Sequence, residues 1–204
     1  MRSIKNKYIK NYISSIALIL IVIFIYPHIS TAQQDEMKIG NEKVDRYNAL
    51  SADYIPTDLK EIAQEWNYHG SDYKKFVRAE VFEKLNALLL AARKDGVNLR
   101  IVSAYRSYAK QERLYNSAVR RKGPDQKTTA KPGHSEHQLG TAIDFATSDP
   151  STALESSFGE TKAYQWLKNN ATRFGFYQTY REDNQKITGY IPEPWHFRYL
   201  GTSD

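Results

Sequence analysis

Cysteine is absent from the 204-residue sequence. Its absence excludes a disulfide framework, a thiolate nucleophile and a sulfur ligand for a metal. Any metal bound by this chain must therefore be held by histidine and carboxylate side chains. The absence of cysteine does not decide the compartment, because exported and cytosolic proteins both fold without disulfides.

Acidic residues are absent from the first 32 positions, which carry four basic residues: Arg2, Lys5, Lys7 and Lys10. Without these four, 25 basic residues stand against 23 acidic ones, so the formal charge of +6 falls to +2. A nearly neutral chain gives little support to a nucleic-acid partner. We therefore expect no nucleic acid among its ligands.

The N-terminal segment has the organisation of an export signal. The apolar run 16–25 and Pro27 follow the basic stretch, and Ser30 and Ala32 have the spacing of a signal-peptidase site. We predict a signal peptide over 1–32, cleaved after Ala32. The alternative is an uncleaved anchor, since the uncharged stretch 11–34 is long enough to span ~30 Å of hydrocarbon. Both alternatives place the remaining chain outside the cytoplasm, so we expect an exported, extracytoplasmic protein.

Internal repeats, low-complexity tracts and long linkers are also lacking, and the length suits one domain. We predict a flexible lead-in over 33–46 and a single folded domain over 47–204. The apolar spacing predicts helices at 71–94, 107–122 and 163–174, a loop at 129–140, and strands at 97–103, 141–146, 176–180 and 195–200. These blocks have no steady βαβ rhythm, which favours an α+β fold with an antiparallel sheet.

The segment 135–144 combines histidine and carboxylate in the pattern Ser-x-His-x2-Gly-x-Ala-x-Asp. On the predicted strand, Asp144 alternates with Ile143 and precedes Phe145, so we expect its carboxylate to be at least partly buried. A buried carboxylate needs a cation or several hydrogen-bond donors. A metal meets this need, with His137 as a second candidate ligand.

A second segment places Glu193 three residues before His196. Pro194 forbids the helix on which a His-Glu-x-x-His motif brings its groups together. A bend at Pro194 is therefore required, with His196 on the metal and Glu193 beside it. Either histidine alone is more often a packing residue, but the two segments together favour a metal site. Two imidazoles and one carboxylate leave a fourth position open, as in a catalytic zinc site.

Together, the segments 135–144 and 193–196 resemble the paired zinc motifs of the VanY-type D-alanyl-D-alanine carboxypeptidases. That family shares a fold with the zinc-binding domain of hedgehog signalling proteins. Three other stretches resemble the family as well: 48–56, 103–108 with Gln111, and 186–190. The resemblance covers about 44–201. It implies a hedgehog-like zinc peptidase domain over 47–204, in which helices flank an antiparallel sheet.

The resemblance implies roles for the matching residues. His137, Asp144 and His196 bind one Zn²⁺ per chain, and Glu193 is the general base that takes a proton from the attacking water.

The resemblance also implies a substrate site. Arg106, Ser135 and Gln111 contact the substrate, and the guanidinium of Arg106 suits a terminal carboxylate or a developing oxyanion. Trp195 lies between base and ligand, where it can wall the pocket; core packing is an equal alternative.

The expected activity is removal of the C-terminal D-alanine from peptidoglycan stem peptides. These peptides are the expected partner, and contact with a membrane is expected only through residues 1–32. Three alternatives remain open: an L,D-carboxypeptidase acting on tetrapeptides, an endopeptidase cutting cross-links, and a non-catalytic zinc-stabilised binding module. Glu193 and Arg106 together count against the binding module, because a structural zinc site needs neither a base nor a substrate cation.

Overall fold

The computed structural model describes residues 42–68 and 73–201. The predicted signal segment, 1–32, and most of the predicted lead-in lie outside these ranges. Within the two described ranges, no helix has the length and apolar character needed to cross a bilayer. Glu42 and Val44, at the end of the predicted lead-in, are both buried. The chain is therefore packed against the domain from its first described residue.

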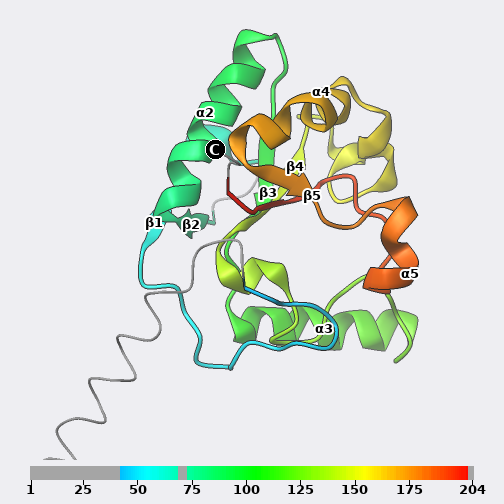
Figure 1. The fold of residues 1–204 in the computed structure, drawn as a ribbon. Helices are drawn as coiled ribbons and strands as arrows, with labels where there is room; N and C mark the ends of the chain where they lie inside the picture. The colour runs from blue at the N-terminus through cyan, green and yellow to red at the C-terminus, as the bar shows by residue number, and fades with distance from the viewer. Residues whose placement is uncertain (1–41, 69–72, 202–204) are drawn as a thin grey trace, which may run out of the picture. The chain divides into compact units, whose positions relative to one another are not determined.

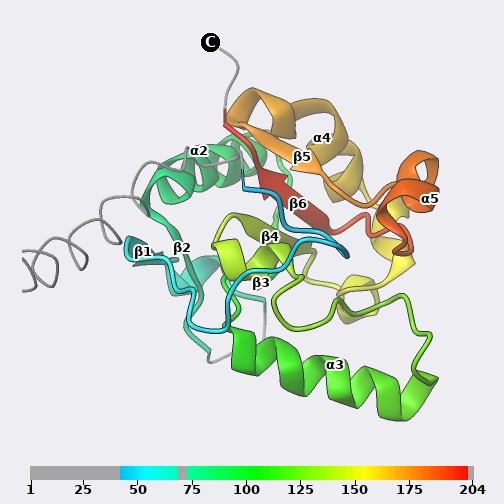
Figure 2. The ribbon, with the colours of Figure 1, turned by 60° about the horizontal axis from the view of Figure 1, so that its bottom comes forward.

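A four-stranded antiparallel sheet lies at the centre, with the strand order β3-β4-β6-β5 (Figures 1 and 2). Its strands are β3 (Arg100–Ser103), β4 (Ala142–Ala146), β5 (Phe176–Gln178) and β6 (His196–Tyr199). The register pairs Asp144 on β4 with His196 on β6 and with Ser103 on β3. Three segments far apart in the sequence therefore meet beside Asp144. The α+β class and the antiparallel sheet predicted from the sequence are confirmed.

Two helices cover one face of this sheet. They are α2 (Ala79–Lys94) and α4 (Lys162–Asn170), and Figure 1 shows both on the opposite side of the sheet from α3. The buried residues of α2 recur at three- and four-residue spacing and join the hydrophobic core with Ile143, Phe145 and Phe197. Each fully buried leucine in this layer contributes about 1.5–3 kcal/mol. Since side chains alternate along a strand, Asp144 and His196 face away from this core.

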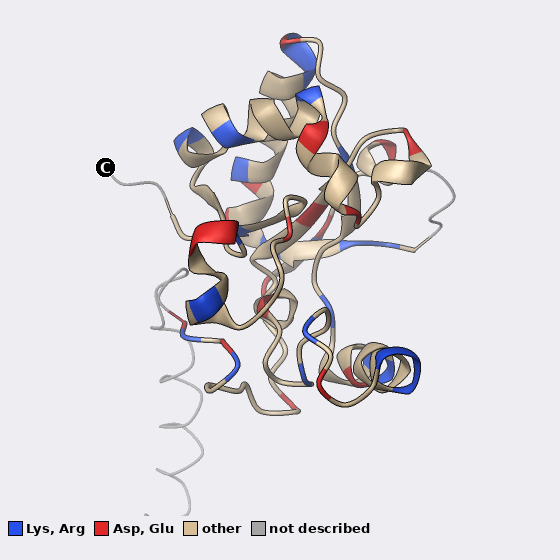
Figure 3. Cartoon of the chain, turned by 90° about the vertical axis from the view of Figure 1, so that its right-hand side faces the viewer, with Lys and Arg blue, Asp and Glu red and all other residues tan. Residues whose placement is uncertain are grey.

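Helix α3 (Tyr108–Lys122) lies on the other side. It begins as predicted, because Ser107 Oγ accepts a hydrogen bond from the backbone N–H of Lys110 at 3.4 Å. It ends at Gly123, whose φ of 86° favours glycine. The last turn exposes three basic residues that suit the negative end of the helix dipole (Figure 3): Arg120, Arg121 and Lys122.

The structure corrects the start of the first predicted helix. Phe76–Arg78 forms strand β2, which pairs antiparallel with β1 (Leu59–Glu61), so α2 begins only at Ala79. A strand fits because Val77 is buried between two half-buried neighbours. At the new start, an Asp58 carboxylate oxygen accepts the backbone N–H of Ala79 at 3.3 Å.

Short helical turns make up the remaining elements. The predicted helix 163–174 is divided into α4 and a 3-10 turn, Ala171–Phe174, and the predicted loop 129–140 contains the 3-10 turn η2, Glu136–Leu139. The other turns are Gln64–Trp66, Pro150–Thr152, Ser156–Glu160, Glu182–Asn184 and α5 (Gln185–Thr188). Turn η2 shortly precedes β4, and its His137 reaches the same side of the sheet as Asp144.

Candidate active site and metal centre

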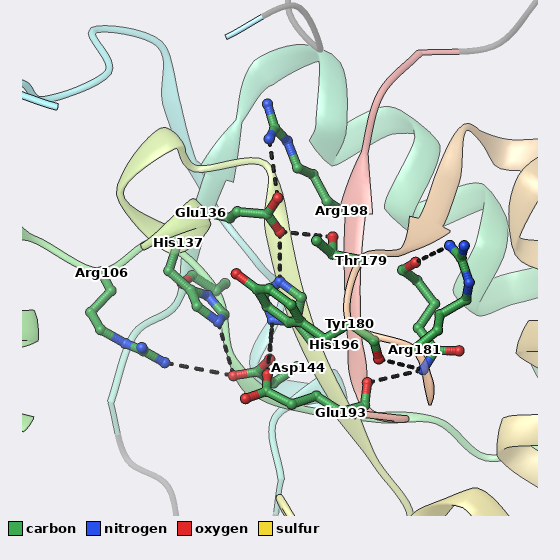
Figure 4. Close-up of polar contacts among 12 residues, drawn as sticks. Arg106, Glu136, His137, Asp144, Thr179, Tyr180, Arg181, Glu193, His196 and Arg198 are labelled. Carbon is green, nitrogen blue, oxygen red and sulfur yellow. Dashed lines mark hydrogen bonds and ion pairs between the residues drawn. The ribbon is translucent and has the colours of Figure 1, made fainter. Parts of the chain in front are cut away.

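The three predicted metal ligands converge. Ligand atoms of His137, Asp144 and His196 all lie within 4.8 Å of one another, and all three side chains are buried (Figure 4). His137 Nε2 lies 3.0 Å from Asp144 Oδ2, and His196 Nδ1 lies 2.9 Å from Asp144 Oδ1. Asp144 and His196 are brought together by the β4–β6 register, and His137 is brought to them by turn η2.

The two imidazoles present different ring nitrogens to Asp144, Nε2 in His137 and Nδ1 in His196. Hydrogen bonds on the other nitrogen of each ring explain this difference. His137 Nδ1 lies 2.8 Å from the carbonyl oxygen of Ala104, which can only accept, so Nδ1 carries a proton and Nε2 is left for a metal. His196 Nε2 lies 2.9 Å from Glu136 Oε2, which leaves Nδ1 for a metal. Metal-binding histidines characteristically have such a partner on the second nitrogen.

The charges at the centre also suit a cation. Burial alone would raise the pKa of Asp144, but His137 and His196 hold that pKa far below its usual range. Burial would lower the pKa of His196, but hydrogen bonds to Asp144 and Glu136 outweigh burial and raise the pKa to about 10. Carboxylates that stabilise a proton on His196 would also stabilise a metal cation at its Nδ1. The donor set and its charge therefore fit zinc, with a coordination position left for a further ligand.

Glu193 lies beside this centre. A turn brings the backbone N–H of His196 within 3.1 Å of the Glu193 carbonyl oxygen, so the predicted bend at Pro194 is present. Glu193 Oε2 lies 3.9 Å from His196 Nδ1. Burial raises the pKa of Glu193 from 4.5 to about 7, against the opposing effect of His196. A carboxylate with a pKa near neutrality suits general base catalysis.

Arg106 also contacts Asp144. Its Nη2 lies 3.6 Å from Asp144 Oδ2 and donates to Ser103 Oγ at 2.9 Å. Its Nη1 donates to Gln111 Oε1 at 2.9 Å, while Gln111 Nε2 donates to the carbonyl of Ala130 at 2.7 Å. Gln111 therefore orients Arg106, and its direct contact with substrate stays a prediction.

A single cavity of about 590 Å³ unites the predicted site. A cavity of this size is typical of small-molecule and short-peptide sites. Its lining includes all eight residues singled out in the sequence: Arg106, Gln111, Ser135, His137, Asp144, Glu193, Trp195 and His196.

Some residues of the site carried no recognised signal in the sequence. Glu136 precedes the candidate ligand His137, and its buried carboxylate contacts the other candidate ligand histidine, His196. Tyr180 lines the cavity, with its ring 4.9 Å from the ring of His196. Arg198 donates to Glu136 at 3.1 Å from within β6. The available signal was the position of the charged residue Arg198 within the predicted strand 195–200.

Comparison with known proteins identifies the family. Residues 74–202 match the family model described as VanY, D-alanyl-D-alanine carboxypeptidase. The chain belongs to this family. It is 36% identical over 160 residues to the putative carboxypeptidase YodJ of Bacillus subtilis, a match that covers 78% of this chain and 59% of the relative. It is 34% identical over 180 residues to a D-alanyl-D-alanine carboxypeptidase of Enterococcus faecalis, covering 83% of this chain and 61% of the relative. The chain thus spans about three fifths of the length of these two relatives.

Solved structures of VanY-type enzymes share the fold. The structure of the L,D-carboxypeptidase LdcB superposes with a TM-score of 0.71 at 34% identity, covering 78% of this chain and 76% of LdcB. A mutant of the vancomycin-resistance D,D-pentapeptidase VanY, in complex with Zn(II), gives a TM-score of 0.65 at 30% identity and covers 79% and 88% of the two chains. VanYB in complex with D-alanine-D-alanine gives 0.64 at 31% identity, with coverages of 79% and 87%.

Proposed function

We propose that this protein is a zinc-dependent D,D-carboxypeptidase that removes the C-terminal D-alanine of peptidoglycan stem peptides. The observation that carries the proposal is the convergence of His137, Asp144 and His196 in a cavity that also contains Glu193 and Arg106. Membership of the VanY family supports it, as does the Zn(II) complex of a VanY relative.

One zinc ion per chain would be held by His137 Nε2, Asp144 and His196 Nδ1, the atoms that the hydrogen bonds turn toward one another. Zinc, when bound, supplies Lewis acidity that activates water and polarises a peptide carbonyl. The protein's own contribution is to fix the two imidazoles and to exclude bulk water from the buried ligands.

Glu193 transfers a proton from the attacking water to the leaving amine. Its carboxylate, beside His196, accepts a proton from the water molecule that attacks the carbonyl carbon of the terminal peptide bond. As the C–N bond breaks, the same carboxylate returns that proton to the amine of the departing D-alanine. The shortened peptide is left with a carboxylate.

Arg106 provides the positive charge for substrate. The guanidinium is fixed by Ser103 and Gln111 and faces the cavity, where it can bind the terminal carboxylate or the oxyanion that develops during attack. Ser135 and Trp195 line the same cavity and contact the peptide. Binding of the terminal carboxylate by Arg106 favours a carboxypeptidase over an endopeptidase, whereas binding of the oxyanion would serve both.

A second candidate function is that of an L,D-carboxypeptidase, in which the same catalytic groups hydrolyse a different peptide bond. The similarity to LdcB, an L,D-carboxypeptidase, favours release of the single D-alanine of a tetrapeptide. The similarity to VanYB, which binds D-alanine-D-alanine, favours the pentapeptide.

The test is D-alanine release by the purified protein from a pentapeptide ending in D-Ala-D-Ala and from a tetrapeptide ending in one D-Ala, with and without a zinc chelator. We expect chelator-sensitive release from the pentapeptide. Release from the tetrapeptide alone would transfer the assignment to the L,D activity. No release from either peptide by zinc-loaded protein would contradict both assignments and favour an endopeptidase or a binding module.

The proposal includes action outside the cytoplasm, where stem peptides are accessible. It is supported by the basic and apolar organisation of residues 1–32. Mass spectrometry of the protein from cells should find a new N-terminus at Gln33, while an intact Met1 in the membrane fraction would indicate an uncleaved anchor instead.

A further inference from the structure

The buried side chain of Glu136 makes three hydrogen bonds. Its Oε2 lies 2.9 Å from His196 Nε2 and accepts from Thr179 Oγ1 at 2.8 Å, while its Oε1 accepts from Arg198 Nη1 at 3.1 Å (Figure 4). Only 4% of Glu136 is exposed. The carboxylate therefore lies directly behind a candidate zinc ligand, on the side away from Asp144.

Burial of this charge is costly unless it is paired, and packing alone would be served by an uncharged side chain of the same size. Arg198 compensates the charge and is itself held by the backbone carbonyl of Glu42 at 2.7 Å. The result is a buried chain of contacts from Glu42 through Arg198 and Glu136 to His196. Because this chain of contacts ends at Nε2 of His196, the Glu136 carboxylate acts on the imidazole of His196.

We propose that Glu136 is a positioning residue for the metal centre: it holds the proton of His196 on Nε2 and thereby directs Nδ1 toward the metal. The inference rests on the proposed zinc function. A carboxylate on the second nitrogen fixes the orientation of a ligand histidine and increases its basicity. His137 is held differently, by the neutral backbone carbonyl of Ala104, which no side-chain substitution removes.

The first test compares Glu136→Gln with Glu80→Gln. Glu80 accepts a hydrogen bond from the hydroxyl of Tyr199 at 2.7 Å, so it contacts the same strand as His196 through a different residue. Zinc affinity is measured by competition with a chelator, and the visible absorption spectrum of the cobalt-substituted protein reports the ligand geometry. We expect Glu136→Gln to lose about 10–100-fold in zinc affinity and to alter the cobalt spectrum. Glu80→Gln should change neither.

A second measurement uses the unaltered, zinc-loaded protein and does not depend on whether a variant folds. Long-range proton–nitrogen NMR correlations identify which nitrogen of each imidazole carries a proton. We expect the proton on Nε2 in His196 and on Nδ1 in His137. A proton on Nδ1 of His196 would overturn the inference.

These outcomes separate the inference from the proposed function. Tight zinc binding and D-alanine release by the unaltered protein, with unchanged zinc affinity and cobalt spectrum in Glu136→Gln, would overturn the role of Glu136 alone. Failure of the unaltered protein to bind zinc at all would overturn the proposed metal centre, and the inference with it.

Discussion

The two sides of the candidate metal centre differ in exposure and in the partners of their charged groups. On the inner side, the side chains of Glu136 and Arg198 are 5% and 8% exposed and bind each other. On the cavity side, the side chains of Glu193 and Arg106 are 15% and 17% exposed and line a space large enough for a peptide. Asp144 lies between the two sides. We therefore expect substitutions on the inner side to affect folding stability and zinc affinity, and substitutions on the cavity side to affect turnover.

The largest expected effect comes from the residue shared by both sides. Asp144→Asn removes the charge that faces His137, His196 and Arg106, so we expect loss of zinc and of all measurable D-alanine release. Zinc content and release are measured on the same preparation, with Asp149→Asn as the control, because Asp149 is exposed and its carboxylate accepts hydrogen bonds from neighbouring Ser151. Normal zinc content in Asp144→Asn would contradict the ligand assignment.

Loss of Arg198, on the inner side, should act mainly on stability. Arg198→Met removes the arginine that pairs with the buried Glu136 carboxylate, and breaking a buried pair in this way costs about 3–5 kcal/mol. Denaturant unfolding of chelator-treated protein measures the loss without a contribution from zinc. Removal of the exposed partner in the pair Lys60–Glu83, by Lys60→Met, should change the free energy of unfolding by less than about 1 kcal/mol. Equal losses in the two variants would contradict the distinction between the inner pair and a surface pair.

Substitution on the cavity side should act on turnover. Arg106→Ala is expected to lower kcat/KM for the pentapeptide by about 10²–10³-fold while zinc stays bound, because it removes a donor for the oxyanion or terminal carboxylate. Arg106→Lys should recover little of the loss, since an ammonium cannot reproduce the fork that binds Ser103 and Gln111. Parallel loss of zinc and turnover would give Arg106 a structural role instead.

The smallest effect is expected at Gln111, which acts on the site through its hydrogen bond with Arg106. Gln111→Leu removes the acceptor that orients Arg106 and leaves the carbonyl of Ala130 without this donor. A loss of about 1–1.5 kcal/mol corresponds to roughly tenfold in kcat/KM. Gln111→Glu keeps the acceptor for Arg106 and should retain more activity than Gln111→Leu. The reverse order in steady-state kinetics would show that Gln111 acts through another contact.

Much of the centre was predictable because its residues lie in two short segments. The alternation around Asp144 predicted a buried carboxylate, and Pro194 predicted the bend that places Glu193 near His196. Local spacing sufficed for these features. The same reasoning predicted the strands of the central sheet to within a few residues.

The remaining features depend on contacts between distant segments. The apolar spacing around Phe76–Arg78 fits a helix as well as a strand, and pairing with Leu59–Glu61 decides between them. Glu136 and His196 are 60 positions apart, so their hydrogen bond has no local signal. The orientation of His137 depends on the carbonyl of Ala104, which carries no sequence information because every residue has one.

The most direct test of a zinc peptidase with Glu193 as its base measures zinc content and D-alanine release in the same preparations of wild-type and Glu193→Gln protein. We expect one zinc per chain in both proteins and a loss of release of about 10²–10⁴-fold in the variant. Full release by the zinc-loaded variant would contradict the role of Glu193 and the chemistry assigned to the cavity.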